Sequence, residues 1–536
     1  ALISIIDLFA SRNRFGSLSG GAMPIAHGGA SDLISRFGES WHPVAMGSAS
    51  SAPTWVALSG IASSLTLGNV SFFFATLFFI APILAFIAMY RVTKRFGLSV
   101  TVSSIAGLLY ALSPVIWNSV NEGRLGTLVV ALLVPTFLSF NPLNITSSLS
   151  WRKVYGIVLF AGLIGAFAPL LLSIWTLIAL AVFGKEFANR IPEIRSEKFV
   201  KFVMTKDLAL EKRLLALALL PGAINFPWSA SFLLHPTQIL LDTGLPLSGG
   251  SAISLFLFNP GGISGLPFWV ISPMLIFLLT LIFSNRFTKV GVICSALLIF
   301  ALLFSPLHIS GHGSTGKFWS GQILVVIESL IIPRVLQLAS DLLPNLRTSK
   351  LGIGHFASGL ISLLTIYSLV FTSAWAVTAG ANSVLKSGTP NVIPPFISSL
   401  SDTPAKPKTL VVQKTNDETK YFITRGFDLE LGDPDVTVGT PTEIESAVDG
   451  MTSGSGISAS KVLGSYGIQY VYMRNPIDQG LVRTIDGLGG FTRAASTSDG
   501  ISWKVQGALG HVAFLSSDGT YSSLRSGAIG VTGELK

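Results

Sequence analysis

The chain has 536 residues, half of them hydrophobic and only 12% charged, with a mean hydropathy of +0.63. This composition excludes a soluble globular protein and indicates an integral membrane protein. The net charge of +9 does not indicate a nucleic-acid partner, because the basic residues lie in short loops between apolar segments. The single cysteine, Cys294, lies in an apolar run, which excludes a disulfide framework and a thiolate metal site.

The N-terminal segment ALISIIDLFA is apolar but only about half as long as the roughly 20 residues that cross a bilayer. No charged segment precedes it and no signal-peptidase-like site follows it. We therefore expect the sequence to begin within a helix of a longer parent protein.

Long apolar segments follow and predict membrane spans. They lie at roughly 70–90, 98–117, 126–143, 214–233, 267–285, 290–306, 322–343 and 353–377. The run 155–184 has Pro169 in its middle, and proline interrupts the helical hydrogen-bond ladder, so we interpret this run as two short helices. With the partial first helix the sequence predicts about eleven spans.

The distribution of Lys and Arg orients these spans. Five loops, those after 90, 150, 184, 285 and 343, hold seventeen basic residues, and the alternate loops hold five. Because short cytoplasmic loops are rich in Lys and Arg, the poor loops are predicted to lie outside. These are the long first loop 11–69, the turn 118–125, and the loops 234–266 and 307–321. The same alternation predicts that the whole C-terminal region, after the last span, also lies outside.

Two further elements complete the predicted architecture. The segment 52–68 is apolar on one face, which favours a helix lying in the membrane interface. From about 379 the chain becomes polar and carries strand-like runs and a helix-like segment at 441–465. We thus expect a polytopic α-helical membrane domain over 1–378 and an extracytoplasmic α/β or α+β domain over 379–536.

Catalysis on a lipid-linked substrate requires a carboxylate or histidine for proton transfer and cations for phosphate, all at one membrane face. Before the C-terminal domain, the predicted outer loops offer four carboxylates: Asp32, Glu39, Glu122 and Asp242. A catalytic base on this face is expected among them.

The segment GGASDLISRFGESWHP, within the first loop, carries the richest mixture. Asp32, Arg36 and Glu39 have the spacing i, i+4 and i+7, which places them on one face of a short capped helix. Asp32 is the predicted base, with Glu39 second and Arg36 as a phosphate contact; a solvated amphipathic helix is the alternative. Trp41 is predicted to stack on a sugar or anchor the interface, and His42 to shuttle protons or bind a hydroxyl.

The short outer turn NEGRLGT holds Glu122 and Arg124. An arginine fork at the mouth of the membrane is suited to a phosphate or diphosphate. An ion pair of Arg124 with Glu122, which fixes the turn, is the alternative.

The remaining outer loops supply secondary candidates. His235 and Asp242 lie in a partly apolar loop, and Lys317 lies in a Gly-rich loop with His308 and His312. The segment GSTGK in that loop resembles half of a phosphate-binding loop, but Phe318 occupies the Ser or Thr position. Lys317 is still predicted to contact a lipid phosphate. Two histidines without a third ligand do not predict a metal.

Ionisable residues also occur in predicted spans, where they are functional candidates by default. Asp7 lies in the first helix, and Glu328, Arg334 and Asp341 lie in or at the end of a later one. A structural ion pair between Glu328 and Arg334 is the alternative.

Four quoted stretches carry a resemblance to a known family: GGASDLISRFGESWHPVAMGSASSAPTW, LLYALSPVIWNSVNEGRLGTLVVALLVPTF, FPWSASFLLHPTQILLDTGLP with LFNPGGISGLP, and VLGSYGIQYVYMRN. Together they resemble the multi-span C-terminal half of large actinobacterial family-2 glycosyltransferases. In those proteins a cytoplasmic nucleotide-sugar transferase domain precedes the membrane region, and its acidic motif is not in this sequence. The membrane half itself resembles the GT-C architecture.

The resemblance implies a glycosyltransferase of the bacterial plasma membrane. Its donor would be a polyprenyl-phosphate sugar, its acceptor an envelope glycan or lipid, and its base the first-loop carboxylate matched by Asp32, with a divalent cation optional. Fold resemblance alone does not establish activity. The alternatives are a non-catalytic membrane anchor or lipid-glycan conduit for a cytoplasmic transferase domain and, last, a secondary transporter.

Overall fold

The computed structural model describes most of the chain. The described residues are 2–26, 28–142, 150–196, 209–245, 249–262, 266–311, 314–348, 352–388, 393–401, 407–415, 418–425, 429–437, 440–475, 477–497, 499–509, 513–515 and 521–523.

The chain divides into two compact units. Unit 1 comprises 1–38, 51–309 and 316–388, and unit 2 comprises 39–50, 310–315 and 389–536. The main boundary thus falls at Gly388, ten residues beyond the expected end of the membrane domain at 378. Two short segments from within the expected membrane domain belong to unit 2. The sequence did not predict this, because neither segment differs clearly in composition from its neighbours.

Unit 1 is helical. Its helices are α1 (Leu2–Ala10), α2 (Ala30–Gly38), α3 (Thr54–Ser63), η1 (Ser64–Thr66), α4 (Val70–Arg95), α5 (Val100–Ala111), α6 (Pro114–Asn121), α7 (Leu125–Ser139), α8 (Trp151–Phe167), α9 (Pro169–Ser196), α11 (Ala209–Ile224), α12 (Trp228–Leu234), η2 (Pro236–Leu240), α13 (Ala252–Phe256), α14 (Met274–Ile282), α15 (Thr288–Phe304), α16 (Gly321–Thr348) and α17 (Ile353–Ala381). Short strands β1 (Leu18–Ser19) and β4 (Lys386–Ser387) pair with each other, and the hairpin β2 (His308–Gly311) and β3 (Ser314–Lys317) precedes α16.

Among the described residues, four helices are long and apolar enough to cross a membrane. They cover 70–95, 169–190, 321–341 and 358–381. Two bent pairs, α5 with α6 at 43° and α11 with α12 at 98°, raise the number to six if each pair counts as one span. The expected number of about eleven is not confirmed. Segments predicted as single spans at 98–117 and 214–233 are broken, and α7 and α15 have only 15 and 17 residues.

The predicted break in the run 155–184 is confirmed, but only the first of the two helices is short: α8 has 17 residues and α9 has 28. Helix α8 ends at Phe167, Ala168 leaves the helical conformation with φ −143° and ψ 80°, and α9 begins at Pro169. The cause is the expected one, since proline excludes the helical conformation for the residue before it and is well tolerated at the first helical position.

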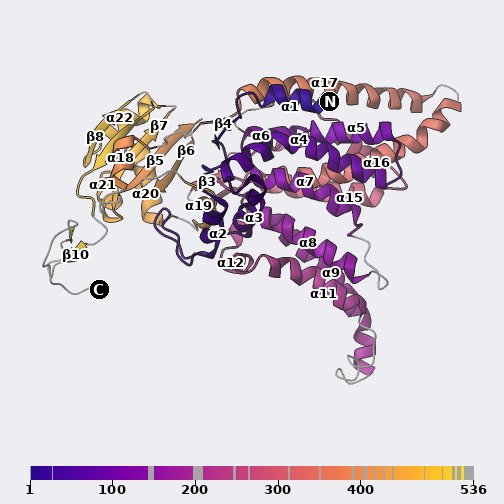
Figure 1. Cartoon of the computed structure of the whole chain (residues 1–536), viewed down its shortest axis with the longest axis horizontal. Coiled ribbons are helices and arrows are strands. Elements are labelled where there is room, and N and C mark those ends of the chain that lie inside the picture. Colours follow the sequence, from indigo (N-terminus) through magenta and orange to yellow (C-terminus); the bar gives the residue numbers. More distant parts are fainter. Residues whose placement is uncertain are drawn as a thin grey trace. The chain divides into compact units, whose positions relative to one another are not determined.

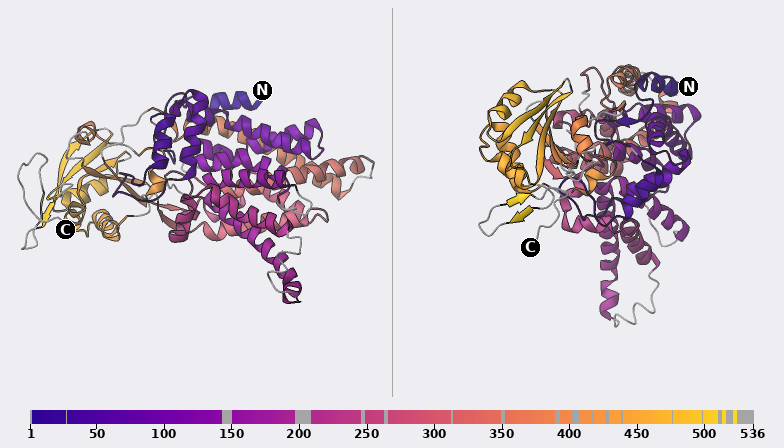
Figure 2. Two further views of the ribbon diagram at one scale, coloured as in Figure 1. Left: turned by 60° about the horizontal axis from the view of Figure 1, so that its bottom comes forward. Right: turned by 60° about the vertical axis from the view of Figure 1, so that its left-hand side comes forward.

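The helices of unit 1 form two groups (Figure 1). In the first, α4 packs against α5 and α7, α16 packs against α7, α5, α14 and α15, and α1 lies along α17. In the second, α8, α9 and α11 contact one another, and the contact between α7 and α8 joins the two groups. Figure 2 shows α9 and α11 extending together beyond their neighbours.

Unit 2 contains a five-stranded mixed sheet, drawn in orange and yellow in Figure 2. Its strands are β5 (Lys408–Thr415), β6 (Glu418–Thr424), β7 (Ile468–Arg474), β8 (Phe491–Ser496) and β9 (Gly500–Val505), in the order β6-β5-β7-β9-β8. Only β5 and β7 are parallel. The unit also has the short hairpin β10 (Ala513–Leu515) and β11 (Tyr521–Ser523), with helices α18 (Pro395–Ser401) and α19 (Asp433–Val436).

The core of unit 2 lies between the sheet and three helices, α20 (Thr442–Ser453), α21 (Ala459–Ser465) and α22 (Gln479–Gly487). Residues such as Ile444, Leu463 and Ile485 pack against Val471 and Trp503 of the sheet. The helix expected at 441–465 is therefore two helices. Gly454 ends the first of them in a left-handed conformation with φ 79°, which glycine adopts without steric cost.

Candidate active site

The central turn of the site lies between α6 and α7. Ser113 caps α6 and Pro114 occupies its first position, an arrangement that fixes a helix start. Helix α6 ends at Asn121, and Gly123 has φ 68°, which lets the chain reverse tightly. The Arg124 N–H bonds to the Ser119 carbonyl at 2.9 Å. The side chains of Glu122 and Arg124 are thereby directed from one rigid turn.

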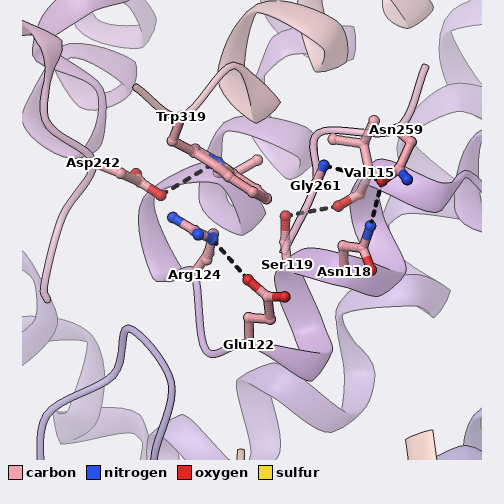
Figure 3. A network of polar contacts seen from close by, with 10 residues as sticks. Val115, Asn118, Ser119, Glu122, Arg124, Asp242, Asn259, Gly261 and Trp319 are labelled. Carbon is pink, nitrogen blue, oxygen red and sulfur yellow. Dashed lines mark hydrogen bonds and ion pairs between the residues drawn. The ribbon is translucent and has the colours of Figure 1, made fainter. Parts of the chain in front are cut away.

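Arg124 is the centre of a buried polar cluster (Figure 3). Its Nε lies 3.2 Å from Glu122 Oε2, and its guanidinium carbon lies 3.4 Å from the centre of the Trp319 ring. Glu122 and Arg124 are 0% and 1% exposed. Burial lowers the pKa of the Arg124 guanidinium, and the charges of Glu122 and Asp242 oppose that effect. The ion pair of Glu122 with Arg124, which was the alternative prediction for this turn, is therefore present. Because the pair is buried, the attraction between its two charges is stronger than it would be in water.

Asp242, after η2, is the half-buried carboxylate of the cluster. Its Oδ1 accepts from the Thr243 N–H at 3.0 Å and from Gln322 Nε2 at 2.8 Å, while Oδ2 accepts from the Thr127 hydroxyl at 3.4 Å. Burial raises the pKa of the Asp242 carboxyl above its usual range, and the charge of Arg124 is the largest opposing influence. Oδ2 is the less strongly bonded oxygen, so a proton transferred to this carboxylate would be placed there.

A chain of hydrogen bonds fixes the orientation of Asp242. Trp319 Nε1 donates to the Thr127 hydroxyl at 2.8 Å, and that hydroxyl in turn donates to Asp242. The Thr127 oxygen is held as an acceptor by the indole, so its proton must point elsewhere. Trp319 thus contacts Arg124 through its ring face and positions Asp242 through its ring nitrogen.

Backbone from the first loop and from the 242–262 region closes around the turn. The Ala22 N–H donates to the Glu122 carbonyl at 2.8 Å, and the Leu245 N–H donates to the Ala22 carbonyl at 2.9 Å. A Cβ on Gly21 would lie 2.2 Å from the Glu122 carbonyl oxygen, and one on Gly262 would lie 1.8 Å from Glu122 Oε1. Glycine is required at both positions for this approach.

A second contact anchors the 249–262 loop to α6. Asn118 Nδ2 donates to Asn259 Oδ1 at 3.1 Å, and the same oxygen accepts from the Gly261 N–H at 3.0 Å (Figure 3). The loop is thereby fixed beside the Glu122 side chain.

The charges of two carboxylates, Glu122 and Asp242, both act on the Arg124 guanidinium. Among the described residues, no group of three or more His, Cys, Asp and Glu side chains is placed to hold a metal ion. The optional cation stays an untested prediction.

Three of the residues predicted from the sequence meet in this cluster: Glu122, Arg124 and Asp242. The other seven are described next.

The first-loop helix is shorter than its spacing predicted. Asp32 lies in the first turn of α2, is exposed, and its Oδ2 accepts the Gly29 N–H at 2.8 Å. Arg36 is half-buried in the last turn. Helix α2 ends at Gly38, so Glu39 is not on its face and belongs to unit 2. The i, i+7 relation of Asp32 and Glu39 was wrong because glycine ends the helix one residue too early.

Trp41 and His42 also belong to unit 2. Trp41 is 56% exposed and packs on Gly47, and His42 is 5% exposed, with its Nδ1 3.7 Å from Glu39 Oε2. The backbones of His42 and Ser48 exchange both hydrogen bonds. These residues therefore form a tight loop within unit 2.

The secondary candidates stand apart from the described contacts of the cluster. His235 is exposed at the end of α12. Lys317 is half-buried at the end of β3, two residues before Trp319. His312 lies outside the described residues.

The ionisable residues of α16 do not form the internal pair considered above. Glu328 is 0% exposed and lies beside Ser113, the residue that caps α6. Arg334 lies over the rings of Phe96 and Phe287, 4.5 Å and 5.4 Å from their centres. Asp341 forms an exposed pair with Arg286. Asp7, in α1, is buried and accepts from the Ser11 hydroxyl at 3.1 Å.

The sequence did not single out Trp319, Thr127 or Gln322. Trp319 follows the Gly-rich segment that was analysed for Lys317, and Thr127 and Gln322 lie at the predicted outer ends of two spans. That position was the usable signal, because the polar residues in the first turn of α7 and α16 were predicted to lie on the same outer side as Asp242.

Comparison with known proteins shows the fold. The structure of arabinofuranosyltransferase AftD from Mycobacteria is 14% identical, with a TM-score of 0.54 over 94% of this chain and 39% of that chain. A mutant of AftD gives 14% identity and a TM-score of 0.54 over 95% and 41%. ArnT from Cupriavidus metallidurans, bound to undecaprenyl phosphate, is more distant, at 12% identity and a TM-score of 0.44 over 94% and 96%, and carries no inference.

The architecture is accordingly GT-C-like, that of a multi-pass membrane protein with a small sheet-containing unit. The chain spans about two fifths of the length of the AftD chain that it matches. No family model and no curated protein matches the sequence.

Proposed function

We propose that the chain is the membrane part of a glycosyltransferase, which transfers a sugar from a polyprenyl-phosphate donor to an envelope glycan or lipid. The observation that carries the proposal is the pairing of a half-buried carboxylate, Asp242, with a buried arginine, Arg124, in one cluster. Proton acceptor and phosphate-binding cation are the two groups that this reaction requires. The GT-C-like fold, shared with an arabinofuranosyltransferase, supports the same reaction class.

The proposed topology places the cluster on the outer face of a bacterial plasma membrane, with unit 2 also outside. The excess of Lys and Arg in alternate loops supports this orientation. Of the roughly eleven expected crossings, those beyond the long helices would be made by short and bent helices such as α7 and α15. A cytoplasmic family-2 transferase domain in the parent protein belongs to the same proposal and rests on the sequence resemblance.

In the proposed step, the acceptor hydroxyl loses its proton to a carboxylate and its oxygen bonds to the anomeric carbon of the donor. The bond from that carbon to the phosphate oxygen breaks, and polyprenyl phosphate leaves with the electron pair. Arg124 would stabilise the charge that develops on the phosphate, because a desolvated guanidinium needs no reorganisation to do so.

Two carboxylates compete for the role of base. Asp242 is favoured because burial raises its pKa, which makes it the stronger base at neutral pH. Asp32, the base expected from the resemblance, is exposed and engaged with the Gly29 N–H. It stays a prediction that the same experiment tests.

The test replaces Asp242 and Asp32 separately by Asn in the full-length protein, reconstituted with a labelled polyprenyl-phosphate sugar. Asp341→Asn is the matched control. Asp341 lies near the C-terminal end of α16, away from the cluster, and pairs with Arg286. Loss of a general base lowers kcat by about 10²–10⁴-fold. We expect that loss for Asp242→Asn, with folding unchanged.

Each other outcome has a distinct meaning. A loss confined to Asp32→Asn would assign the base to the first loop and leave Asp242 a structural role. Normal transfer by both variants would overturn the catalytic proposal and favour an anchor or lipid-glycan conduit for a cytoplasmic transferase domain.

A further inference from the structure

Four apolar side chains stand out from unit 1 where α3 meets α4. Ile61, Leu65, Leu67 and Phe72 are 61%, 85%, 100% and 61% exposed. We call these residues the apolar knob. They occupy a single joint, formed by the end of α3, the short helix η1 and the first turn of α4.

Leu67 is costly to keep in this conformation. It has φ 56° and ψ 31°, in the left-handed region, which costs a non-glycine residue about 1–2 kcal/mol. A fully exposed leucine also leaves its apolar surface in contact with solvent. Within the part of unit 1 that the structure describes nothing compensates for either cost, so we look for the compensating contact beyond those residues.

The neighbouring span identifies that contact. Helix α4 begins at Val70, three residues after Leu67, and its 26 residues extend about 39 Å against about 30 Å of hydrocarbon. Its last turn carries Lys94 and Arg95, which places that end inside. The first turn of α4, and the knob with it, therefore reaches the outer boundary of the bilayer.

Polar residues surround the knob. Ser64 and Asn69 are exposed between the apolar side chains, and Asn69 caps α4 by accepting the Phe72 N–H at 2.9 Å. Alternation of exposed apolar and hydrogen-bonding groups is suited to the headgroup and upper acyl region of a bilayer. A protein partner would not require this position directly above a membrane span.

We propose that the apolar knob inserts into the outer leaflet of the lipid bilayer and so fixes the height of α2 at the membrane surface. The connection between knob and α2 is direct. The Ala30 N–H donates to the Gly68 carbonyl at 3.0 Å, and Gly60 lies so close to α2 that a Cβ there would be 3.0 Å from the Ala30 carbonyl oxygen. The N-terminal turn of α2, with Asp32, moves only with the knob.

Site-directed spin labelling tests the insertion without any activity assay. Cys294, the single cysteine, is buried and is replaced by alanine, after which cysteine is introduced at Leu67, at Leu65 or at a reference position. The references are Ile366→Cys, an exposed position within the span of α17, and Lys461→Cys, on α21 of unit 2. The labelled full chain is placed in lipid nanodiscs, and collision rates with oxygen and with a water-soluble nickel complex are measured.

We expect labels at 65 and 67 to follow the Ile366 reference, with high oxygen and low nickel accessibility. If both follow the Lys461 reference instead, the knob lies in water and the inference is overturned. Leu65, in η1, serves as the second position should Leu67→Cys fold poorly.

The connection to α2 has its own test. A label at Ser35→Cys, on the exposed part of α2, is measured with and without the double change Leu65→Ser and Leu67→Asn. Asn is chosen because it tolerates the left-handed conformation. A rise of at least twofold in nickel accessibility at position 35 supports the connection, and an unchanged value overturns it.

Discussion

The guanidinium carbon of Arg124 lies 3.4 Å from the centre of the Trp319 indole ring, and the two side chains are 1% and 4% exposed. The stacked indole removes water from one face of a buried cation. A desolvated contact of this kind contributes about 2 kcal/mol or more. Trp319 therefore stabilises the charge around which the candidate site is built.

Replacement of Trp319 separates its two contacts. Trp319→Phe keeps an aromatic face over Arg124 and loses only the donation to Thr127, which is expected to lower the free energy of unfolding by about 1 kcal/mol. Trp319→Leu loses both and is expected to cost at least about 2 kcal/mol more. Chemical unfolding in detergent checks the order. Equal losses for the two variants would argue against the stacking contact.

The ion pair of Glu122 and Arg124 is expected to be more harmful to break than to remove. Glu122→Gln removes the carboxylate that is ion-paired with Arg124, leaves the charge of Asp242 in place and is expected to cost about 3–5 kcal/mol, whereas the double change to Met at both positions costs less. Asp341→Asn breaks the exposed pair with Arg286 and should change stability by at most about 1 kcal/mol. The midpoints of thermal unfolding of the three variants test this ranking, which would fail if the double variant were the least stable.

Close packing at Gly21 has a matched control at Gly97. Both have a left-handed backbone, with φ 64° and 84°, but only Gly21 lies against another segment, 2.2 Å from the Glu122 carbonyl oxygen as measured to an added Cβ. Gly97→Ala is expected to cost about 1–2 kcal/mol from its backbone alone. Gly21→Ala is expected to cost more and to lower transfer, because the Glu122 turn must move. Similar stability and activity for the two variants would contradict this.

Gln322 offers a test through pH. Its amide donates to Asp242 and so favours the ionised carboxylate, lowering a pKa that burial raises. Gln322→Met removes that donor at similar volume, so the pKa of Asp242 rises further. Because a general base acts only when ionised, the acidic limb of kcat/KM is expected to move to higher pH, with the plateau rate retained. An unmoved limb would indicate that Asp242 is not the titrating base.

The sequence predicted the helices better than the site. Apolar runs located α4, α16 and α17, and Pro169 located a helix boundary to the residue, because these depend on local composition and backbone sterics. The meeting of Arg124 with Asp242 and Trp319 depends on three segments distant in sequence. Arg124 and Asp242 could be named as candidates because they are charged residues in predicted outer loops. No local pattern specifies that these loops converge, or that Trp319 joins them.

The first loop contains a helix end and a unit boundary that the sequence did not predict. Asp32 and Glu39 were assigned to one helix face because their spacing fits a helical period. The chain instead leaves the helix at Gly38 and contributes residues 39–50 to unit 2. Tertiary packing, here Ala45 in the core of unit 2, decided a boundary that periodicity did not indicate.

That contribution has a consequence for how unit 2 can be separated and made. Ala45 lies in its core, the Ala45 carbonyl accepts from Arg425 Nε at 2.9 Å, and the Ser48 hydroxyl donates to the Val436 carbonyl at 2.6 Å. A fragment that starts after Gly388 lacks this strip, and a single protease cut there leaves the strip joined to the helices. Unit 2 is thus an interleaved part of the polypeptide, whose folding must wait for, or retain, a piece synthesised some 340 residues earlier.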